Sequence, residues 1–326
     1  MAPELCVYIP NLDGGARLRR TLQTLAAQTM PAPVVVIDNG SSDDSPDAAE
    51  RELGARVIRL DRNIGFGRAL NLGVGKYPAE LLVFLNNDVE CEPQLLEALV
   101  ETSGAEGADT VAGVLLQMER EDLIDSAGVV VDRTLLAWDY LHGESIDKAT
   151  GATPPLGPTG GVALFKRDIF ERVGGFDERI FAYLEDVDLA LRIRCAGGIC
   201  ALAPTARALH HHSSTLGSGS AAKNRLMGWS RGYLLRRYGI LKDPALVAPT
   251  LARELAIAGG QVVIDRTTSG ITSRLAGWSA AAKLPRRPLP VEGLLDVSTA
   301  EALRMRSLRR RRPDTPRRAG VQVRDL

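Results

Sequence analysis

Three carboxylates lie within four residues near the middle of the chain, at Glu185, Asp186 and Asp188. Like charges this close together raise one another's pKa, so at least one of these groups can act as a base near neutral pH. Acids are also common in the first turn of a helix, where they complement the helix dipole. The cluster alone supports the catalytic and the structural interpretation about equally.

A second set of chemically suited residues follows the apolar run 81–85, where Asn86, Asn87 and Asp88 offer hard oxygen ligands for Mg²⁺ or Mn²⁺. One carboxylate does not hold such an ion well, so a second protein ligand is needed. We expect this ligand to be His210, the first of three adjacent histidines at 210–212. Three neighbours cannot all face one point, so at least two of them are expected to be solvated loop residues.

Asp38 ends another apolar run and is followed by Asn39, Gly40 and two serines. A carboxylate in this place suits hydrogen bonds to a nucleobase or a ribose, and the small residues let a ligand approach the backbone. The alternative is an Asx-turn that only caps the helix that follows.

The segment from Asn63 to Arg68 has glycines at 65 and 67, but Leu70 occupies the third glycine position of a dinucleotide-binding fingerprint. This departure disfavours a nicotinamide-dependent dehydrogenase. The segment is better suited to a helix N-terminus that meets a diphosphate together with Arg68. A helix start eased by glycine, without a ligand, remains the alternative.

These polar residues are positioned by four short apolar runs, at residues 5–9, 34–37, 56–60 and 81–85, which alternate with helix-like segments. Alternating strands and helices predict an α/β fold with a mostly parallel sheet. Ligands bind such sheets at the carboxyl ends of the strands. The polar residues after each run, from Pro10 and Asn11 onward, should therefore share one edge.

The composition indicates a soluble globular protein, with 45% hydrophobic and 25% charged residues among 326. Forty basic residues balance forty acidic ones, so no global charge favours nucleic acid as a partner. Four cysteines without a C-x-x-C pair are typical of reduced thiols, and we expect a cytoplasmic location. The sequence shows no signal-peptide pattern and no run of eighteen apolar residues, so if the protein meets a membrane, we expect it to do so from one side only.

Read in order, the chain contains Ile-Pro-Asn, Val-Ile-Asp-Asn-Gly-Ser-Ser-Asp, Asn-Ile-Gly-Phe-Gly-Arg, Phe-Leu-Asn-Asn-Asp, Thr-Gly-Gly and Tyr-Leu-Glu-Asp-Val-Asp. With these motifs, residues 4–215 resemble the family-2 glycosyltransferases, above all their rhamnosyltransferase-like branch. The resemblance implies the GT-A fold of nucleotide-diphospho-sugar transferases and a transfer that inverts the sugar's anomeric configuration. Two positions depart from the family: Asn11-Leu12-Asp13 follows Pro10 where Thr-Tyr-Asn is common, and Asn86 replaces the first acid of the Asp-x-Asp element.

The resemblance also implies roles for individual residues. Asp186 would be the catalytic base, and Asp88 and His210 would bind Mg²⁺ or Mn²⁺. The acceptor side would be formed by Thr159, Gly160, Gly161 and Glu185. The nucleotide-sugar donor, with dTDP or UDP as its nucleotide, would be contacted by Pro10, Asn11, Asp38, Asn39, Gly40, Asn63, Gly65, Phe66, Arg68, Asn86 and Asn87.

We expect three regions: a catalytic domain at 1–225, a helical extension at 226–282 and a disordered tail rich in Pro and Arg at 283–326. In the extension, Trp229, Tyr233 and Tyr238 interleave with arginines. This composition suits an interfacial helix on a membrane, but an ordinary helix packed on the catalytic domain is favoured about two to one. Together with the basic tail, it makes a polyprenyl-diphosphate-linked glycan at the inner membrane leaflet a suitable acceptor, and a soluble acceptor remains open.

The function expected from the sequence is therefore an inverting glycosyltransferase that moves a sugar, L-rhamnose by resemblance, in cell-wall or surface polysaccharide synthesis. The alternative is a relative that binds nucleotide sugars and has lost catalysis. Asp88, Asp186 and His210 favour an active enzyme, because a protein that only binds has no need of a base facing a metal.

Overall fold

The structure is a computed structural model that describes residues 4–211 and 220–302. Its first half alternates strand and helix, as the apolar periodicity predicts. The strands that open the chain are β1 (Leu5–Asn11), β2 (Val34–Asp38), β3 (Arg56–Arg59) and β4 (Leu81–Leu85), and the helices between them are α1 (Gly15–Ala26), α2 (Ser45–Leu53) and α3 (Phe66–Lys76).

The second half of the α/β body contains shorter and less regular elements. They are β5 (Val89–Cys91), α4 (Leu95–Ala105), β6 (Thr110–Gln117), β7 (Arg120–Ser126), β8 (Val129–Val131), β9 (Ala137–Asp139), η1 (Ile146–Ala149), β10 (Val162–Lys166), α5 (Arg167–Arg172), α6 (Glu185–Cys195) and β11 (Cys200–His210).

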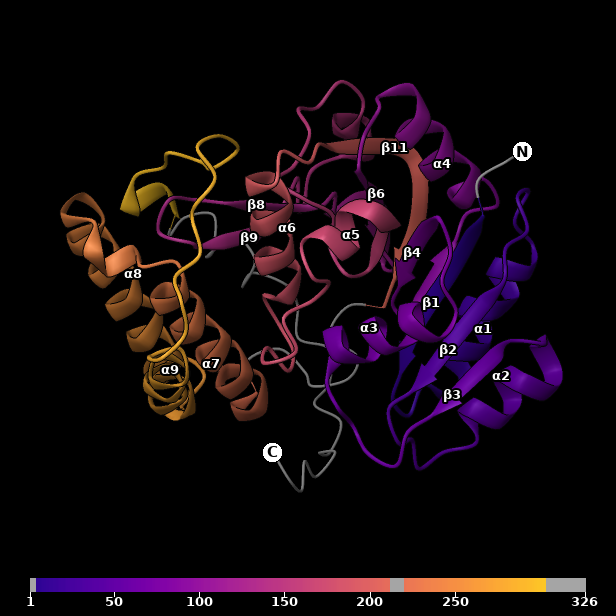
Figure 1. Cartoon of the computed structure of the whole chain (residues 1–326), viewed down its shortest axis with the longest axis horizontal. Coiled ribbons are helices and arrows are strands. Elements are labelled where there is room, and N and C mark those ends of the chain that lie inside the picture. The colour runs from indigo at the N-terminus through magenta and orange to yellow at the C-terminus, as the bar shows by residue number, and fades with distance from the viewer. Residues whose placement is uncertain (1–3, 212–219, 303–326) are drawn as a thin grey trace.

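One curled sheet runs through the body in the order β3-β2-β1-β4-β10-β6-β11-β5, with β7 paired to β6 (Figure 1). Strands β3, β2, β1 and β4 are parallel, whereas β10 enters antiparallel between β4 and β6. The expected α/β fold with a mostly parallel sheet is confirmed. Because β10 reverses direction, the loop that precedes it lies at the same edge as the carboxyl end of β4.

Both faces of the sheet are covered by helices, because successive side chains of β1 point alternately into two different apolar clusters. Val7 and Ile9 belong to one apolar cluster, with residues of α1 and α4, whereas Cys6 and Tyr8 belong to the other, with residues of α3, α5 and α6. A strand buried on both faces reads as a continuous apolar run, which explains the sequence pattern.

Three helices form a separate layer beside the sheet: α7 (Ala221–Arg237), α8 (Pro244–Val263) and α9 (Ser269–Ala280), with the short η2 (Ile240–Lys242) between the first two (Figure 1). Helices α7 and α9 approach closely at glycines, and a Cβ on Gly277 would lie 1.9 Å from the carbonyl oxygen of Trp229. Tyr233 and Tyr238 of this layer are buried against α6. The interpretation that places these two tyrosines at a membrane interface is therefore wrong. They pack on the α/β body, as in an ordinary helix of a globular protein.

Within the described residues, none of the helices combines the length and the hydropathy that a bilayer crossing requires. Residues 283–302 belong to the segment whose composition predicts a disordered tail, yet Arg287 in it makes ion pairs with two buried carboxylates. Residues 303–326 lie outside the described part.

Candidate active site

Asn11 connects three strand ends at the carboxyl edge of the parallel strands. It is in register with Asp38 on the neighbouring strand, and its Nδ2 donates to Asp38 Oδ1 at 3.1 Å. Its Oδ1 accepts a hydrogen bond of 2.8 Å from Nδ2 of Asn87, which follows β4. A Cβ on Gly14 would lie 2.2 Å from this Oδ1, so glycine is required there. Pro10, by contrast, is buried within β1, in register with Ile37.

The turn after β2 lies against the loop that leads into α3. Asn39 Oδ1 accepts a hydrogen bond from the backbone N–H of Ile64 at 3.2 Å, and Asn63 Oδ1 accepts one from Gly65 at 2.9 Å. Gly40 has a φ of +79°, and a Cβ there would come within 2.9 Å of Arg62 Cα. The two motifs that the sequence assigns to the donor therefore form one continuous surface.

Helix α3 begins beside Phe181, in the segment that leads into α6. The backbone N–H of Phe66 donates to the carbonyl oxygen of Phe181 at 2.9 Å, and a Cβ on Gly65 would lie 2.5 Å from that same oxygen. Arg68 forms an exposed ion pair of 3.4 Å with Glu178. Exposed pairs of this kind contribute only about 0–1 kcal/mol, so Arg68 can exchange Glu178 for another anion at little cost.

The expected metal ligands are neighbours. Strand β11 pairs with β5, so His210 lies opposite Val89, and His210 Nε2 is 3.5 Å from Asp88 Oδ1. The other ring nitrogen, Nδ1, is 2.7 Å from Oδ2 of Asp125, which lies on β7. Burial alone would lower the pKa of His210, but its hydrogen bonds to Asp125 and Asp88 outweigh burial and raise the pKa to about 9.

This arrangement fits a divalent cation with open coordination positions. A metal-binding histidine usually has its second nitrogen held by a carboxylate, and Asp125 is placed to do this for His210. In the part of the chain that the structure describes, no group of three or more His, Cys, Asp or Glu side chains is arranged to hold a metal ion by itself. Mg²⁺ and Mn²⁺ commonly take only one or two protein ligands and fill the remaining positions with water and substrate phosphate.

Asp125 was missed by the sequence analysis. It stands in no motif, and it lies 85 positions from His210 along the chain. Only the antiparallel pairing of β6 with β7, combined with the parallel pairing of β6 with β11, brings it there.

Asp186 lies in the first turn of α6, next to the Thr-Gly-Gly loop. It accepts hydrogen bonds from the backbone N–H groups of Gly160 and, at 2.8 Å, of Val187. Burial raises the pKa of Asp186 despite these hydrogen bonds. Burial and the nearby charge of Asp186 raise the pKa of Glu185 to about 8. Both shifts have the same consequence: the folded protein disfavours the state in which both carboxylates are charged.

The Thr-Gly-Gly loop joins the acid to the metal-binding edge. The carbonyl oxygen of Gly161 accepts a hydrogen bond of 3.3 Å from the N–H of Asn86, and Thr159 Oγ1 accepts one of 3.0 Å from Gly161. A Cβ on Gly160 would lie 2.9 Å from the ring of Phe66. The segments that carry Asp186 and Asp88 thus meet through this loop at one edge of the sheet, rather than on opposite surfaces.

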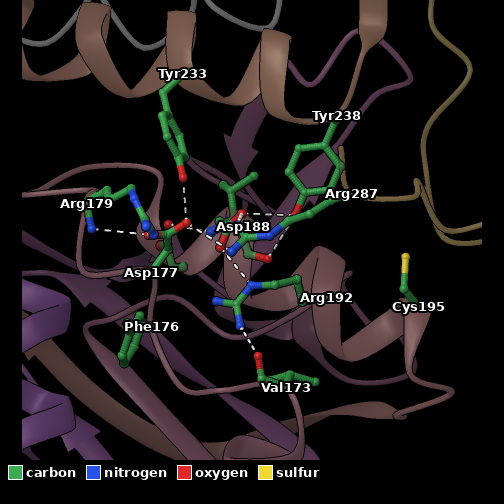
Figure 2. A network of polar contacts seen from close by, with 12 residues as sticks. Val173, Phe176, Asp177, Arg179, Asp188, Arg192, Cys195, Tyr233, Tyr238 and Arg287 are labelled. Carbon is green, nitrogen blue, oxygen red and sulfur yellow. Dashed lines mark hydrogen bonds and ion pairs between the residues drawn. The ribbon is translucent and has the colours of Figure 1, made fainter. Parts of the chain in front are cut away.

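The third acid of the cluster, Asp188, faces away from this edge, into the molecule. Figure 2 shows it with Asp177 in a buried network in which Arg287 bridges both carboxylates, at 2.5 Å from Asp188 and 2.9 Å from Asp177. Tyr238 donates to Asp188 at 2.9 Å, and Tyr233 donates to Asp177 at 2.7 Å. Burial alone would raise the pKa of Asp177, but the hydrogen bond from Tyr233 and the charge of Arg287 help to hold it below its usual range.

The two bridged carboxylates bracket residues 178–187, the acidic loop. Within it, Tyr183 and Leu184 both have a φ of +67°. This left-handed conformation costs a non-glycine residue about 1–2 kcal/mol. The loop therefore depends on its anchors, and one of them, Arg287, comes from far downstream, in a segment whose composition predicts disorder.

Comparison with known proteins gives consistent matches. Residues 6–174 match the family model described as glycosyl transferase family 2. An N-acetylglucosaminyl-diphospho-decaprenol L-rhamnosyltransferase of Mycobacterium tuberculosis is 28% identical over 249 residues, which cover 68% of this chain and 80% of that protein. The O-antigen biosynthesis protein RfbC of Myxococcus xanthus is 30% identical over 65% of this chain, which spans only 18% of that longer protein.

Two solved structures show the same fold. GalNAc-T7 with UDP, GalNAc and Mn²⁺ superimposes with a TM-score of 0.59 at 16% identity, over 85% of this chain and about half, 55%, of that one. The mannosyltransferase PcManGT from Pyrobaculum calidifontis, in complex with GDP-Man and Mn²⁺, gives a TM-score of 0.51 at 18% identity, over 94% and 80% of the two chains.

Proposed function

The chain belongs to glycosyl transferase family 2, and we propose that it transfers L-rhamnose, with inversion, from a nucleotide-diphosphate donor to a polyprenyl-diphosphate-linked glycan. Its family and its relatives in rhamnosyl transfer and O-antigen biosynthesis support a sugar transferase of polysaccharide synthesis. The name of the mycobacterial relative supports the finer choice of sugar and acceptor. A dTDP-sugar is the proposed donor, with UDP-sugars as the alternative.

The single observation that carries this proposal is the meeting of the two acidic segments at the Thr-Gly-Gly loop. Gly160 holds Asp186 through its N–H, and Gly161 holds the strand end that continues into Asp88. A single-step inversion needs a proton acceptor on the acceptor side and a stabiliser of the leaving diphosphate on the other side. These two functions are supplied by separate segments that converge here.

On the donor side, Asn11, Asp38 and Asn87 form a polar floor held by mutual hydrogen bonds. Such a floor suits the hydrogen-bonding groups of a nucleoside. The N-terminus of α3 and Arg68 lie next to it and suit the diphosphate. Asp88 and His210 would hold the divalent cation, which when bound would neutralise charge on the departing diphosphate.

On the acceptor side, Asp186 takes the proton from the acceptor hydroxyl as that oxygen attacks the anomeric carbon. Its raised pKa makes it a stronger base than an ordinary aspartate. Glu185 stays protonated near neutral pH because its pKa is about 8, so it does not compete for the proton. Glu185 Oε2 is buried without a hydrogen-bond partner among the described residues, and an acceptor hydroxyl would supply one.

A thermal-shift panel tests the donor. dTDP-rhamnose, UDP-glucose and GDP-mannose would each be added with and without Mn²⁺. A donor at a hundred times its Kd stabilises the folded protein by about 2.7 kcal/mol, which corresponds to a rise in melting temperature of several degrees. We expect the largest shift with dTDP-rhamnose plus Mn²⁺. A panel in which no nucleotide sugar shifts the melting temperature would contradict the donor site.

Replacement of the base distinguishes an active transferase from a relative that only binds. We expect Asp186→Asn to lower kcat by about 10²–10⁴-fold with the donor Kd nearly unchanged, because only proton transfer is removed. Asp168→Asn, on the exposed surface of α5, makes the same chemical change away from the site and should leave turnover intact. Equal turnover in the Asp186 and Asp168 variants would eliminate Asp186 as the base.

A further inference from the structure

Helices α8 and α9 expose large apolar side chains on their outer surface. Nine large apolar residues are exposed in the described part of the chain, and six of them lie on these two helices or in the turn between them: Leu251, Leu255, Val262, Val263, Ile264 and Leu275. Leu255, Val263 and Leu275 are exposed to 72%, 77% and 67%. Scattered single apolar residues need no explanation, but a concentration of this kind marks an interaction surface.

The exposed positions of α8 follow the helical period. Residues 248, 251, 252, 255, 256, 259, 262 and 263 are all exposed, and all are Ala, Leu, Gly or Val. The charged residues of α8 turn inward instead: Arg253 pairs with buried Asp132, and Glu254 lies 2.8 Å from Arg231 of α7 and 2.7 Å from Arg274 of α9. A helix in water normally has the opposite arrangement, with charges outside. The outer face of α8 is therefore built for an apolar neighbour.

Cationic residues follow these helices in the sequence. Lys283 and Arg286 are exposed directly after α9. The described chain ends at Ala302, which shares an apolar cluster with Ile257 of α8. From that point the sequence 303–326 contains nine arginines and two aspartates. The most basic stretch of the sequence thus follows directly on a residue that packs against α8. Basic residues combined with an apolar face bind anionic lipid headgroups and acyl chains together.

We propose that the outer face of α8 and α9 rests on an anionic lipid bilayer, with the arginine-rich segment at the headgroups. A second copy of the chain is the other obvious occupant of an apolar face. Pairing two copies through this face would bring two arginine-rich segments together, and their like charges would repel. The surface is inferred from exposure and charge alone, and only its use, bringing a lipid-linked acceptor near Asp186, rests on the proposed function.

Vesicle flotation of the full chain tests the surface. The vesicles would contain phosphatidylglycerol and phosphatidylcholine in equal parts, or phosphatidylcholine alone, without donor or acceptor. We expect binding to the anionic vesicles, weakened by high salt, and little binding to the neutral ones. The double variant Leu255→Glu, Val263→Glu should bind about tenfold less, because it places two charges where the acyl chains would lie.

Two controls separate the surface from general effects. Ile199→Glu changes another exposed apolar residue, outside these helices, and should bind as the wild type does. Because the substituted side chains are exposed, all variants should keep the wild-type melting temperature within a few degrees. Replacing Arg309, Arg310, Arg311 and Arg312 by Gln should remove most of the salt-sensitive part of binding.

Three outcomes would overturn the proposal: unchanged vesicle binding by the Leu255, Val263 double variant, absence of binding by the wild type, or a dimer in light scattering that the double variant dissociates. The last outcome would assign the face to a second copy. Nucleotide binding, followed by thermal shift in the same samples, reports separately on the proposed function. A protein that floats with vesicles but binds no nucleotide would refute the transferase and leave the surface in place.

Discussion

Replacing Arg287 by Met should uncouple the acidic loop from its anchors while keeping a side chain of similar length. The guanidinium that bridges Asp177 and Asp188 is only 17% exposed, and the two carboxylates are at most 1% exposed. Removing one partner of a buried ion pair costs about 3–5 kcal/mol. In the variant, Asp188 keeps its ion pair with Arg192 at 2.8 Å, and Asp177 keeps its hydrogen bond from Tyr233. We therefore expect the free energy of unfolding to fall by about 3 kcal/mol, near the lower end of this range.

The loss is measured by urea unfolding of the wild type and of two variants. Arg179→Met is the matched control, because Arg179 contacts the same Asp177 carboxylate at 3.5 Å but is 59% exposed. Its removal should change the free energy of unfolding by only about 0–1 kcal/mol. The free energy of unfolding of Arg287→Lys should lie between those of Arg287→Met and Arg179→Met, because an ammonium group keeps the positive charge but cannot bridge both carboxylates with fixed geometry.

A purely structural role for Arg287 would change stability alone, so catalysis supplies the decisive measurement. At a temperature where every variant is fully folded, we expect Arg287→Met to lower kcat by about 10–100-fold and to leave the donor Kd unchanged, because a shift of about 1 Å in Asp186 suffices for this loss. Arg287→Lys should restore part of the rate. Wild-type kcat in Arg287→Met, or stability equal to that of Arg179→Met, would refute the reasoning.

Three further predictions concern the edge of the sheet. Asp125→Asn should weaken Mn²⁺ binding about 10–100-fold in a calorimetric titration, because it removes the carboxylate that orients the imidazole of His210, the proposed metal ligand; unchanged affinity would contradict that role. Glu185 has a folded pKa of about 8 against a usual 4.5, so its contribution to stability is present below pH 4.5 and is lost as the pH rises to 8. In urea unfolding, the free energy of unfolding of Glu185→Gln should therefore be higher than that of the wild type by at least about 1 kcal/mol above pH 8, with little difference near pH 4. A difference that does not depend on pH would argue against the raised pKa of Glu185. Gly14→Ala should lower donor affinity about tenfold in the thermal-shift assay, because its Cβ would lie 2.2 Å from Asn11 Oδ1, whereas Gly75→Ala, with nothing within 4 Å of its Cβ, should not.

Local patterns in the sequence sufficed for the parallel half of the fold. Each apolar run became a strand, and parallel strands necessarily place their carboxyl ends together, so the contact of Asn11 with Asp38 follows from the pattern. The family resemblance added Gly160 and Asp186, whose contact no periodicity predicts. The roles of these residues in binding and catalysis stay predictions until they are measured.

Long-range pairings were beyond the reach of local patterns. Asp125 reaches His210 only through the pairing of three strands, and Arg287 reaches Asp188 across 99 positions of sequence. The composition of α7, with aromatic and basic residues interleaved, suits an interfacial helix. Tyr233 and Arg231 are nevertheless both buried, because their polar atoms form hydrogen bonds inside the molecule. Composition cannot distinguish a tyrosine that faces lipid from one that donates to a buried carboxylate.

The long sequence separation between Arg287 and the acidic loop affects the order of events during translation. A ribosome that adds about 5–20 residues per second completes Asp188 roughly 5–20 s before it reaches Arg287. Throughout that interval the nascent chain has every strand-end motif, together with Asp177 and Asp188, but lacks the guanidinium that bridges these two carboxylates. The acidic loop is thereby left without one of its anchors until the helical layer has been synthesised, and a polypeptide released early would carry a complete set of motifs without that anchor.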